Sequence, residues 1–187
     1  MYNERMSARL PLFPLNTVLF PGQLLPLHIF EPRYRQLIAE CQKINQPFGV
    51  VLIRSGQEVG LNAEPHPVGT TAKIIQCEKL PDGRLNILCV GDARFRLLQT
   101  HTNLPYLSGT IDLWPWIPVD AITVQGKLGR IRVRLDRYLN LLSQLTNSRI
   151  EIDLPNEPAG LANLAATLLQ IESPEKQQLL ATASNFG

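Results

Sequence analysis

Residues 10 to 30, LPLFPLNTVLFPGQLLPLHIF, carry no formally charged side chain and contain four prolines, at positions 11, 14, 21 and 26. A membrane-spanning helix needs about 20 apolar residues with every backbone group bonded internally, and each proline would remove a donor and break it. The stretch also lacks the compact apolar helix and the small-residue cleavage site of a secretory signal. It therefore predicts two short, mostly buried strands within residues 10–16 and 23–30, with the prolines at strand edges or strand starts and a turn at residues 20–22.

The rest of the composition indicates one ordinary folded core. The chain has 187 residues and a net charge of +2, which is too small to require a nucleic acid or an anionic membrane as partner. Cys41, Cys77 and Cys89 include no C-x-x-C pair, so neither a disulfide framework nor a zinc knuckle is indicated. We expect a cytoplasmic protein of a reducing compartment, with no membrane segment.

Further strand-like runs follow, interrupted by a single amphipathic segment. Tyr34, Leu37, Ile38 and Cys41 lie at helical spacing after Pro32, which predicts a helix of about three turns. Runs rich in Val, Ile, Leu and Thr lie at residues 47–54, 67–80, 82–90, 93–101 and 105–114. One crossover helix among about six strands predicts an α+β protein with a closed or strongly curved sheet.

Two local details follow from turn chemistry. If Asp82 and Gly83 form a two-residue hairpin turn, residues whose numbers sum to 165 face each other, which places Cys77 opposite Leu88. His66 lies between two prolines and is expected in a loop.

The C-terminal third is predicted to be helical. Apolar residues recur there at alternating steps of four and three, namely Val124, Leu128, Ile131, Leu135, Tyr138, Leu142 and Leu145. A second helix is predicted within residues 154–171, with Leu161, Leu164, Ala165 and Leu168 on one face, and a third begins with Ser173 as N-cap and Pro174 in its first turn. We therefore expect a β-barrel domain at residues 1–118 and a helical subdomain at residues 119–187.

The motifs of common enzymes are missing. The string GKLGR at residues 126–130 lacks the order of a phosphate-binding loop, and the sequence contains no G-x-S-x-G elbow. His28, His66 and His101 show no metal-binding spacing. We expect no enzymatic activity, no metal and no cofactor.

Two surfaces are candidates for binding. Trp114 and Trp116 lie in a proline-stiffened connection, where they would either anchor a partner peptide or seal the joint between sheet and helices. Four basic residues, Lys127, Arg130, Arg134 and Arg137, are spaced three, four and three along the first long helix. They would either meet an acidic partner or phosphates, or form a solvated helix face.

Several ordered motifs carry a family resemblance that spans nearly the whole chain. They are LPLFPLNTVLFPGQLLPLHIFEPRYRQLI, VGTTAKI, DGRLNILCVGDARFRLL, PYLSGTI and the tail PAGLANLAATLLQIESPEKQQLLAT. Together they resemble the amino-terminal, substrate-binding domain of the Lon protease family. The resemblance implies a PUA-like β-barrel followed by a helical subdomain. It assigns Pro21, Gly22, Phe30, Glu31, Arg33 and Tyr34 to the fold and not to catalysis.

The sequence ends at Gly187 without an ATPase or peptidase segment, so the resemblance implies a stand-alone, non-catalytic module. We expect it to bind unfolded or degron-bearing polypeptides, as an adaptor in proteolysis or protein quality control, with Lon or another ATP-dependent protease as a partner. Phe20, Pro21, Trp114 and Trp116 are the candidate peptide contacts. The alternative is a PUA-like RNA-binding module that uses the basic helix face, although a nucleic-acid partner is not expected. Spacing leaves a monomer and a homodimer equally open.

Overall fold

The computed structural model describes residues 8–57, 63–117, 121–149 and 152–183. The described residues form an α+β fold with these elements: β1 Ala8–Leu15, β2 Leu24–Ile29, α1 Pro32–Lys43, β3 Phe48–Ser55, β4 Glu64–Lys79, β5 Leu85–His101, β6 Ser108–Leu113, α2 Ala121–Thr146, α3 Pro158–Leu168 and α4 Ser173–Leu180. The predicted fold class is confirmed.

The chain packs into two compact units, which are described separately below. The sheet unit comprises Met1–Pro115 with Ile171–Ala181, and the helical unit comprises Trp116–Gln170 with Thr182–Gly187. Helix α4 therefore packs with the strands, although it follows α2 and α3 in the chain. The domain boundary proposed at residue 118 stays a prediction.

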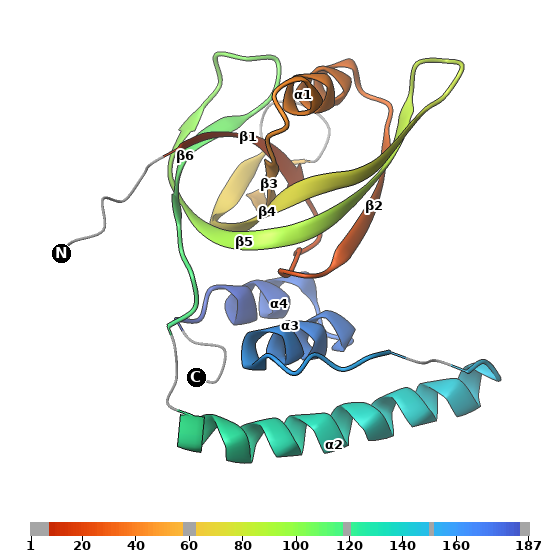
Figure 1. Ribbon diagram of the computed structural model, residues 1–187. Coiled ribbons are helices and arrows are strands. Elements are labelled where there is room, and N and C mark those ends of the chain that lie inside the picture. The colour runs from red at the N-terminus through yellow and green to blue at the C-terminus, as the bar shows by residue number, and fades with distance from the viewer. Residues whose placement is uncertain (1–7, 58–62, 118–120, 150–151, 184–187) are drawn as a thin grey trace. The chain divides into compact units, whose positions relative to one another are not determined.

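The six strands form one sheet in the order β2-β5-β4-β3-β1-β6, and an additional pairing of β6 with β5 closes five of them into a ring (Figure 1). β5 is long enough to serve both ends, because Leu85–Val90 pair with β2 and Phe95–His101 pair with β6. Among the described residues, α1 is the single helix inserted between these strands, as the sequence predicts.

The strand pairing explains where the prolines of β1 and β2 lie. β1 lies between two strands, but β6 pairs only with Ala8–Pro11 and β3 only with Leu12–Leu15. Pro11 and Pro14 thus each have one side without a strand partner, where a missing N–H costs nothing. Pro26 lies on β2, which pairs only with β5. The prediction that prolines lie at strand edges is correct for Pro26 of β2. In β1, each half of the strand has one unpaired side, and each of its two prolines lies in such a half.

The core beneath α1 is aromatic and aliphatic. Tyr34, Leu37, Ile38 and Cys41 are the buried residues of α1, as the helical spacing predicts. The ring of Tyr34 stacks on Phe13 of β1 with 4.0 Å between centroids. Burying these side chains removes apolar surface from water and holds the helix against the sheet.

Two local predictions are wrong by small shifts. The hairpin between β4 and β5 pairs Cys77 with Ile87, not with Leu88. Its loop has three residues, since Leu80 and Arg84 are hydrogen-bonded across it and Gly83 adopts a positive φ of 83°. His66 lies within β4 and not in a loop, because β4 begins at Glu64 and the two flanking prolines are accommodated in the strand.

Helix α4 is fixed to the strands by three hydrogen bonds. Arg94 Nη1 donates to the Leu180 carbonyl at 2.6 Å, Gln177 Nε2 donates to the Val68 carbonyl at 3.0 Å, and Ser173 Oγ donates to the Asn16 carbonyl at 3.0 Å. Glu172, not Ser173, is the N-cap, in a capping box with Glu175. The hydroxyl predicted as a cap instead joins α4 to the segment after β1.

In the helical unit, α2 and α3 pack against each other. Val124, Leu135 and Leu139 of α2 are buried, whereas Leu145 at the end of the predicted apolar series is 82% exposed. Arg132 donates to the Pro155 carbonyl at 2.5 Å and Tyr138 Oη donates to the Leu168 carbonyl at 3.4 Å. Most of the apolar positions predicted along α2 are therefore buried or partly buried, whereas Leu145, the last of them, is exposed.

Candidate functional site

The turn at residues 20–22 belongs to the core of the sheet unit. Phe20 is 1% exposed, and Gly22 and Gln23 exchange backbone hydrogen bonds with Gly91 of β5. A Cβ atom on Gly91 would lie 2.3 Å from the Phe20 carbonyl oxygen, so glycine is needed for this approach. Pro21 keeps a partly exposed side chain. In this structure the Phe20 side chain is a packing residue with no free face for a peptide.

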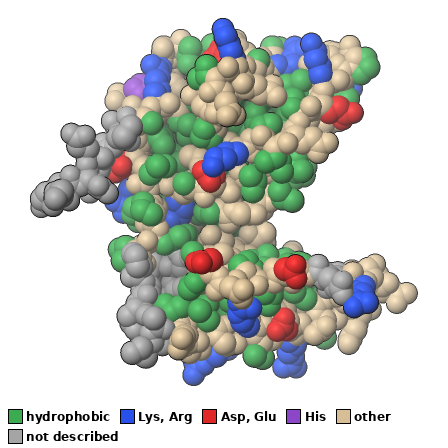
Figure 2. Space-filling model, in the orientation of Figure 1, with side chains coloured by type: hydrophobic (Ala, Val, Ile, Leu, Met, Phe, Trp, Pro, Cys, Tyr) green, Lys and Arg blue, Asp and Glu red, His purple; other side chains and the backbone are tan. Residues whose placement is uncertain are grey.

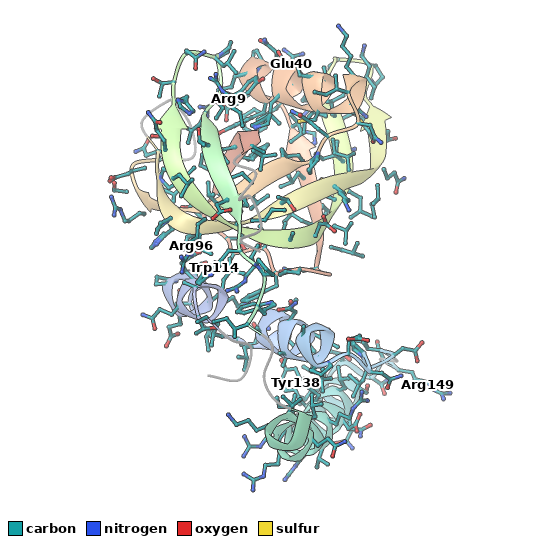
Figure 3. All side chains as sticks on the ribbon, turned by 60° about the vertical axis from the view of Figure 1, so that its left-hand side comes forward. Arg9, Glu40, Arg96, Trp114, Tyr138 and Arg149 are labelled. Atoms are coloured by element: carbon teal, nitrogen blue, oxygen red, sulfur yellow. The ribbon has the colours of Figure 1, made fainter. Side chains whose placement is uncertain are left out.

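Trp114 lies at the end of β6 beside two arginines of β5. The guanidinium carbons of Arg94 and Arg96 lie 4.2 and 3.8 Å from the centre of its ring (Figure 3). Arg94 is buried, and this burial, with the neighbouring charge of Arg96, lowers its pKa to about 10. The indole is half-buried, and its ring serves as a packing surface for these cations.

Trp116 is also half-buried, but it belongs to the helical unit, whereas Trp114 belongs to the sheet unit. The structure therefore does not define a site that contains both indoles.

The four basic residues of α2 are all exposed, and Figure 2 shows Lys and Arg side chains at the surface of the helical unit. Lys127, Arg130, Arg134 and Arg137 share this helix with Val133, which is 69% exposed. The predicted spacing thus places the cations on an accessible face, and their role stays a prediction.

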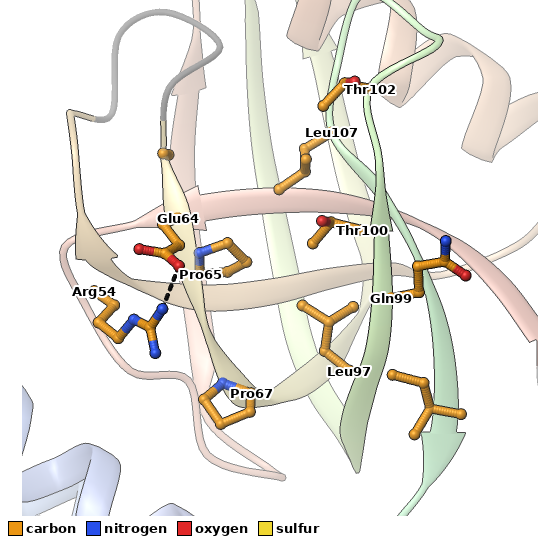
Figure 4. A pocket seen from close by; sticks show the side chains of 11 residues that line it. Arg54, Glu64, Pro65, Pro67, Leu97, Gln99, Thr100, Thr102 and Leu107 are labelled. Carbon is orange, nitrogen blue, oxygen red and sulfur yellow. Dashed lines mark hydrogen bonds and ion pairs between the residues drawn. The ribbon is translucent and has the colours of Figure 1, made fainter.

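A pocket in the sheet unit was not predicted. It has a volume of about 570 Å³ and lies where β4 and β5 separate (Figure 4). Residues Val68–Lys79 of β4 pair with β5. Among the described residues, no pairing joins the start of β4, Glu64–Pro67, to the end of β5, Leu97–Thr100. Instead the start of β4 pairs with β3 and the end of β5 pairs with β6. The wall of the ring is therefore open at this point.

Two prolines explain the separation. Continuing the register that pairs Val68 with Arg96 would put Pro67 opposite Leu97. Pro65 remains in register with Ile53 of β3, which requires its nitrogen to face the other side of the strand, toward β5. Pro67 lies where the β3–β4 register shifts, and it has no N–H to offer to either neighbour. β4 thus offers no N–H donor to β5 at these two positions, and the ladder stops.

The walls of the pocket are mixed in character. Pro65 and Pro67 form one side and Leu97 and Thr100 the other, with Leu107 above them (Figure 4). Leu97 also packs against the smaller buried cluster of the ring.

The rim carries one ion pair. Arg54 and Glu64 are paired across β3 and β4, and Ser55 Oγ donates to Glu64 at 2.8 Å. The Ser55 hydrogen bond and then Arg54 lower the pKa of Glu64 below its usual value. Burial, and then the charge of Arg54, lower the pKa of nearby His66. The rim is thus internally neutralised, and the pocket favours an uncharged occupant.

A second cavity, of about 140 Å³, lies between β1, β2 and the start of α1. It is too small for more than a side chain. Across the described part of the chain, no three His, Cys, Asp or Glu side chains gather as a metal site. None of its helices combines the length and apolar character needed to cross a bilayer.

These features define an α+β domain with a closed sheet and a surface pocket beside an open strand edge. The family model described as "ATP-dependent protease La (LON) substrate-binding domain" matches residues 9–185, and the chain belongs to this family.

Among curated relatives, the Lon protease of Anaeromyxobacter dehalogenans is 30% identical over 183 residues, and Lon protease 2 of Myxococcus xanthus is 29% identical over 193 residues. Each alignment covers 96% of this chain but 22% of the relative. The chain thus spans about a fifth of the length of these proteins.

Solved structures agree. The crystal structure of a Lon N-terminal domain protein from Xanthomonas campestris aligns with a TM-score of 0.71 and 26% identity, covering 95% of this chain and 92% of that one. The N-terminal domain of a Mycobacterium avium complex Lon protease aligns with a TM-score of 0.65 at 14% identity and supports the fold alone.

Proposed function

We propose that this protein binds unfolded or degron-bearing polypeptide segments without catalysing a reaction, and that it acts as an adaptor for Lon or another ATP-dependent protease. The observation that carries the proposal is membership of the Lon substrate-binding domain family over residues 9–185. The open wall of the sheet unit supplies a suitable surface, because an unfolded chain presents apolar side chains and unpaired backbone groups.

Two further features support the proposal. Pro21, Trp114 and Trp116 keep partly exposed side chains and are candidate client contacts, whereas Phe20 would act only by holding the turn in place. Cys41, Cys77 and Cys89 are all free thiols, as expected for a reducing cytoplasm.

The test is fluorescence anisotropy with two labelled probes. One is a reduced and alkylated polypeptide that stays unfolded, with its native, folded form as the matched control; the other is a single-stranded RNA. We expect the unfolded probe to bind and its affinity to change little with salt, because apolar contacts are not screened. Equal affinity for the folded control would contradict the proposal. RNA binding that weakens steeply with salt would instead support the nucleic-acid alternative.

A further inference from the structure

The edge of β5 that faces the pocket has backbone hydrogen-bonding capacity that no strand of the described chain uses. At Phe95 and Arg96, β5 has partners on both sides, β4 on one edge and β6 on the other. Beyond Arg96 the β6 pairing continues to His101, while on the β4 edge the described residues provide no further partner. An unpaired strand edge is a template for another extended backbone.

β4 cannot close over this edge by itself. Pro65 and Pro67 lack the two donors that a continued ladder would use, and the start of β4 pairs with β3 instead. The result is a gap between the β5 edge, which has an irregularity between Leu97 and Gln99, and a β4 side without N–H donors at Pro65 and Pro67, with the pocket of about 570 Å³ between them.

We propose that an extended segment of a client polypeptide adds as a strand to the β5 edge at Leu97–Thr100, antiparallel to β5, in the place that β4 vacates. This inference rests on the proposed function and names the recognition mode of its site. The occupant must be a polypeptide, because only an extended peptide backbone matches the spacing of donors and acceptors along a strand edge.

The pocket sets the side-chain requirement of the bound segment. Successive side chains of a strand point to opposite faces, so every second residue of the segment would meet Pro65, Pro67, Leu97 and Leu107. The pairing of Arg54 with Glu64 leaves no free charge at the rim to hold an ionised side chain. The site therefore selects segments of about four residues, roughly 13 Å, with uncharged apolar residues at alternate positions.

The first experiment scans the backbone of a fluorescein-labelled, eight-residue peptide in which Leu and Thr alternate. Each backbone amide in turn is N-methylated, and binding to the full chain is measured by anisotropy. Strand addition predicts that affinity falls about tenfold or more at every second position, where the N–H faces β5, and changes little at the positions between. Insensitivity to N-methylation at all positions would overturn strand addition.

The second experiment fills the pocket. Thr100 is exposed and its side chain points into the pocket (Figure 4), whereas Gln76 is exposed on β4 and does not line the pocket. We expect Thr100→Trp to weaken peptide binding about tenfold or more and Gln76→Trp, the matched control, to bind like the unmodified protein. Circular dichroism and a thermal melt confirm that each variant is folded.

The outcomes separate this inference from the function on which it rests. If the unfolded polypeptide still binds while Thr100→Trp and the N-methyl series have no effect, the strand-addition site is wrong and the proposed function stands. If neither the peptide nor the unfolded polypeptide binds, the proposed function is wrong and the inference fails with it.

Discussion

Polar side chains buried in the sheet unit are tied to distant parts of the chain. Tyr106 is 1% exposed, and its hydroxyl donates to the carboxylate of Glu40 on α1, 66 residues away. Gln36 Nε2 donates to the same carboxylate at 2.8 Å. The Tyr106 and Gln36 hydrogen bonds lower the pKa of Glu40 below its ordinary value of 4.5. Burial, and then the bond to Glu40, raise the pKa of Tyr106.

This pair predicts a pH dependence of stability. A carboxyl whose pKa is lowered on folding stabilises the native state above its unfolded pKa, and that contribution is lost as the pH falls through the folded value. We expect Tyr106→Phe to reduce the free energy of unfolding by about 1 kcal/mol at pH 7, and the difference from the unmodified protein to shrink below pH 4.5. Urea denaturation of both proteins at pH 7 and pH 3 measures this difference in the free energy of unfolding. A difference that stays constant between those pH values would contradict the assigned role of Glu40.

The cysteines give a second prediction at this scale. Cys77 is exposed, while Cys41 and Cys89 are buried. Burial raises the pKa of Cys41 to about 11 and that of Cys89 to about 12, so little of either exists as the reactive thiolate at neutral pH. We expect iodoacetamide to modify one thiol in the native protein and all three in urea, as counted by mass spectrometry. Loss of the native adduct in Cys77→Ser would identify the site, and rapid native modification of three thiols would contradict the prediction.

At the scale of elements, proline positions decide where strands pair. In β1 the two prolines fit because β6 and β3 each take half of the strand. In β4 they fit because the strand leaves β5 and follows β3. The missing N–H of proline thus accompanies split pairing in β1 and an opening between β4 and β5.

Restoring the missing donors should close the opening. We expect Pro65→Thr with Pro67→Thr to let β4 pair with β5 further, which slows native-state hydrogen exchange of the backbone amides in Leu97–Thr100 several-fold. Mass spectrometry of the peptide that covers this segment measures the change. Pro26→Thr, on β2, is the matched control and should leave exchange there unaltered. Unchanged exchange in the double variant would show that the prolines do not cause the separation.

At the scale of the whole molecule, the proposed binding surface belongs to the sheet unit, and the four basic residues of α2 belong to the helical unit. Because none of the four basic residues lines the pocket, we expect the two surfaces to act independently. Hydrogen bonds to strands fix α4 in the sheet unit, so that unit is built from both ends of the chain.

Charge reversal tests this independence. We expect Arg130→Glu with Arg134→Glu to leave the affinity for the unfolded polypeptide within about twofold, because both side chains are exposed and neither lines the pocket. Anisotropy in low and moderate salt measures the affinity, and Arg130→Gln with Arg134→Gln is the control for loss of charge alone. A tenfold loss in the charge-reversed variant would move the client site to α2.

Much of the fold could be predicted because its signals are local. Tyr34, Leu37, Ile38 and Cys41 identify α1 by spacing alone, and alternating apolar runs identify the strands. The candidate site was harder to predict. The sequence leaves Trp114 either as a peptide anchor or as a packing residue, and only the structure shows that Arg94 and Arg96 lie over its ring. The string EPHP predicts a loop at His66, yet its two prolines at alternate positions are the available signal for an opened strand.

The sequence by itself determined the α+β class, the single inserted helix and the family, because periodicity, turn residues and ordered motifs act over short distances along the chain. Only the tertiary structure decided that Phe20 is buried, that α4 packs on the strands and that β4 leaves β5 at Val68. Each of these depends on partners far apart in sequence, such as Arg94 and Leu180, 86 residues apart, and no local pattern specifies such a pair.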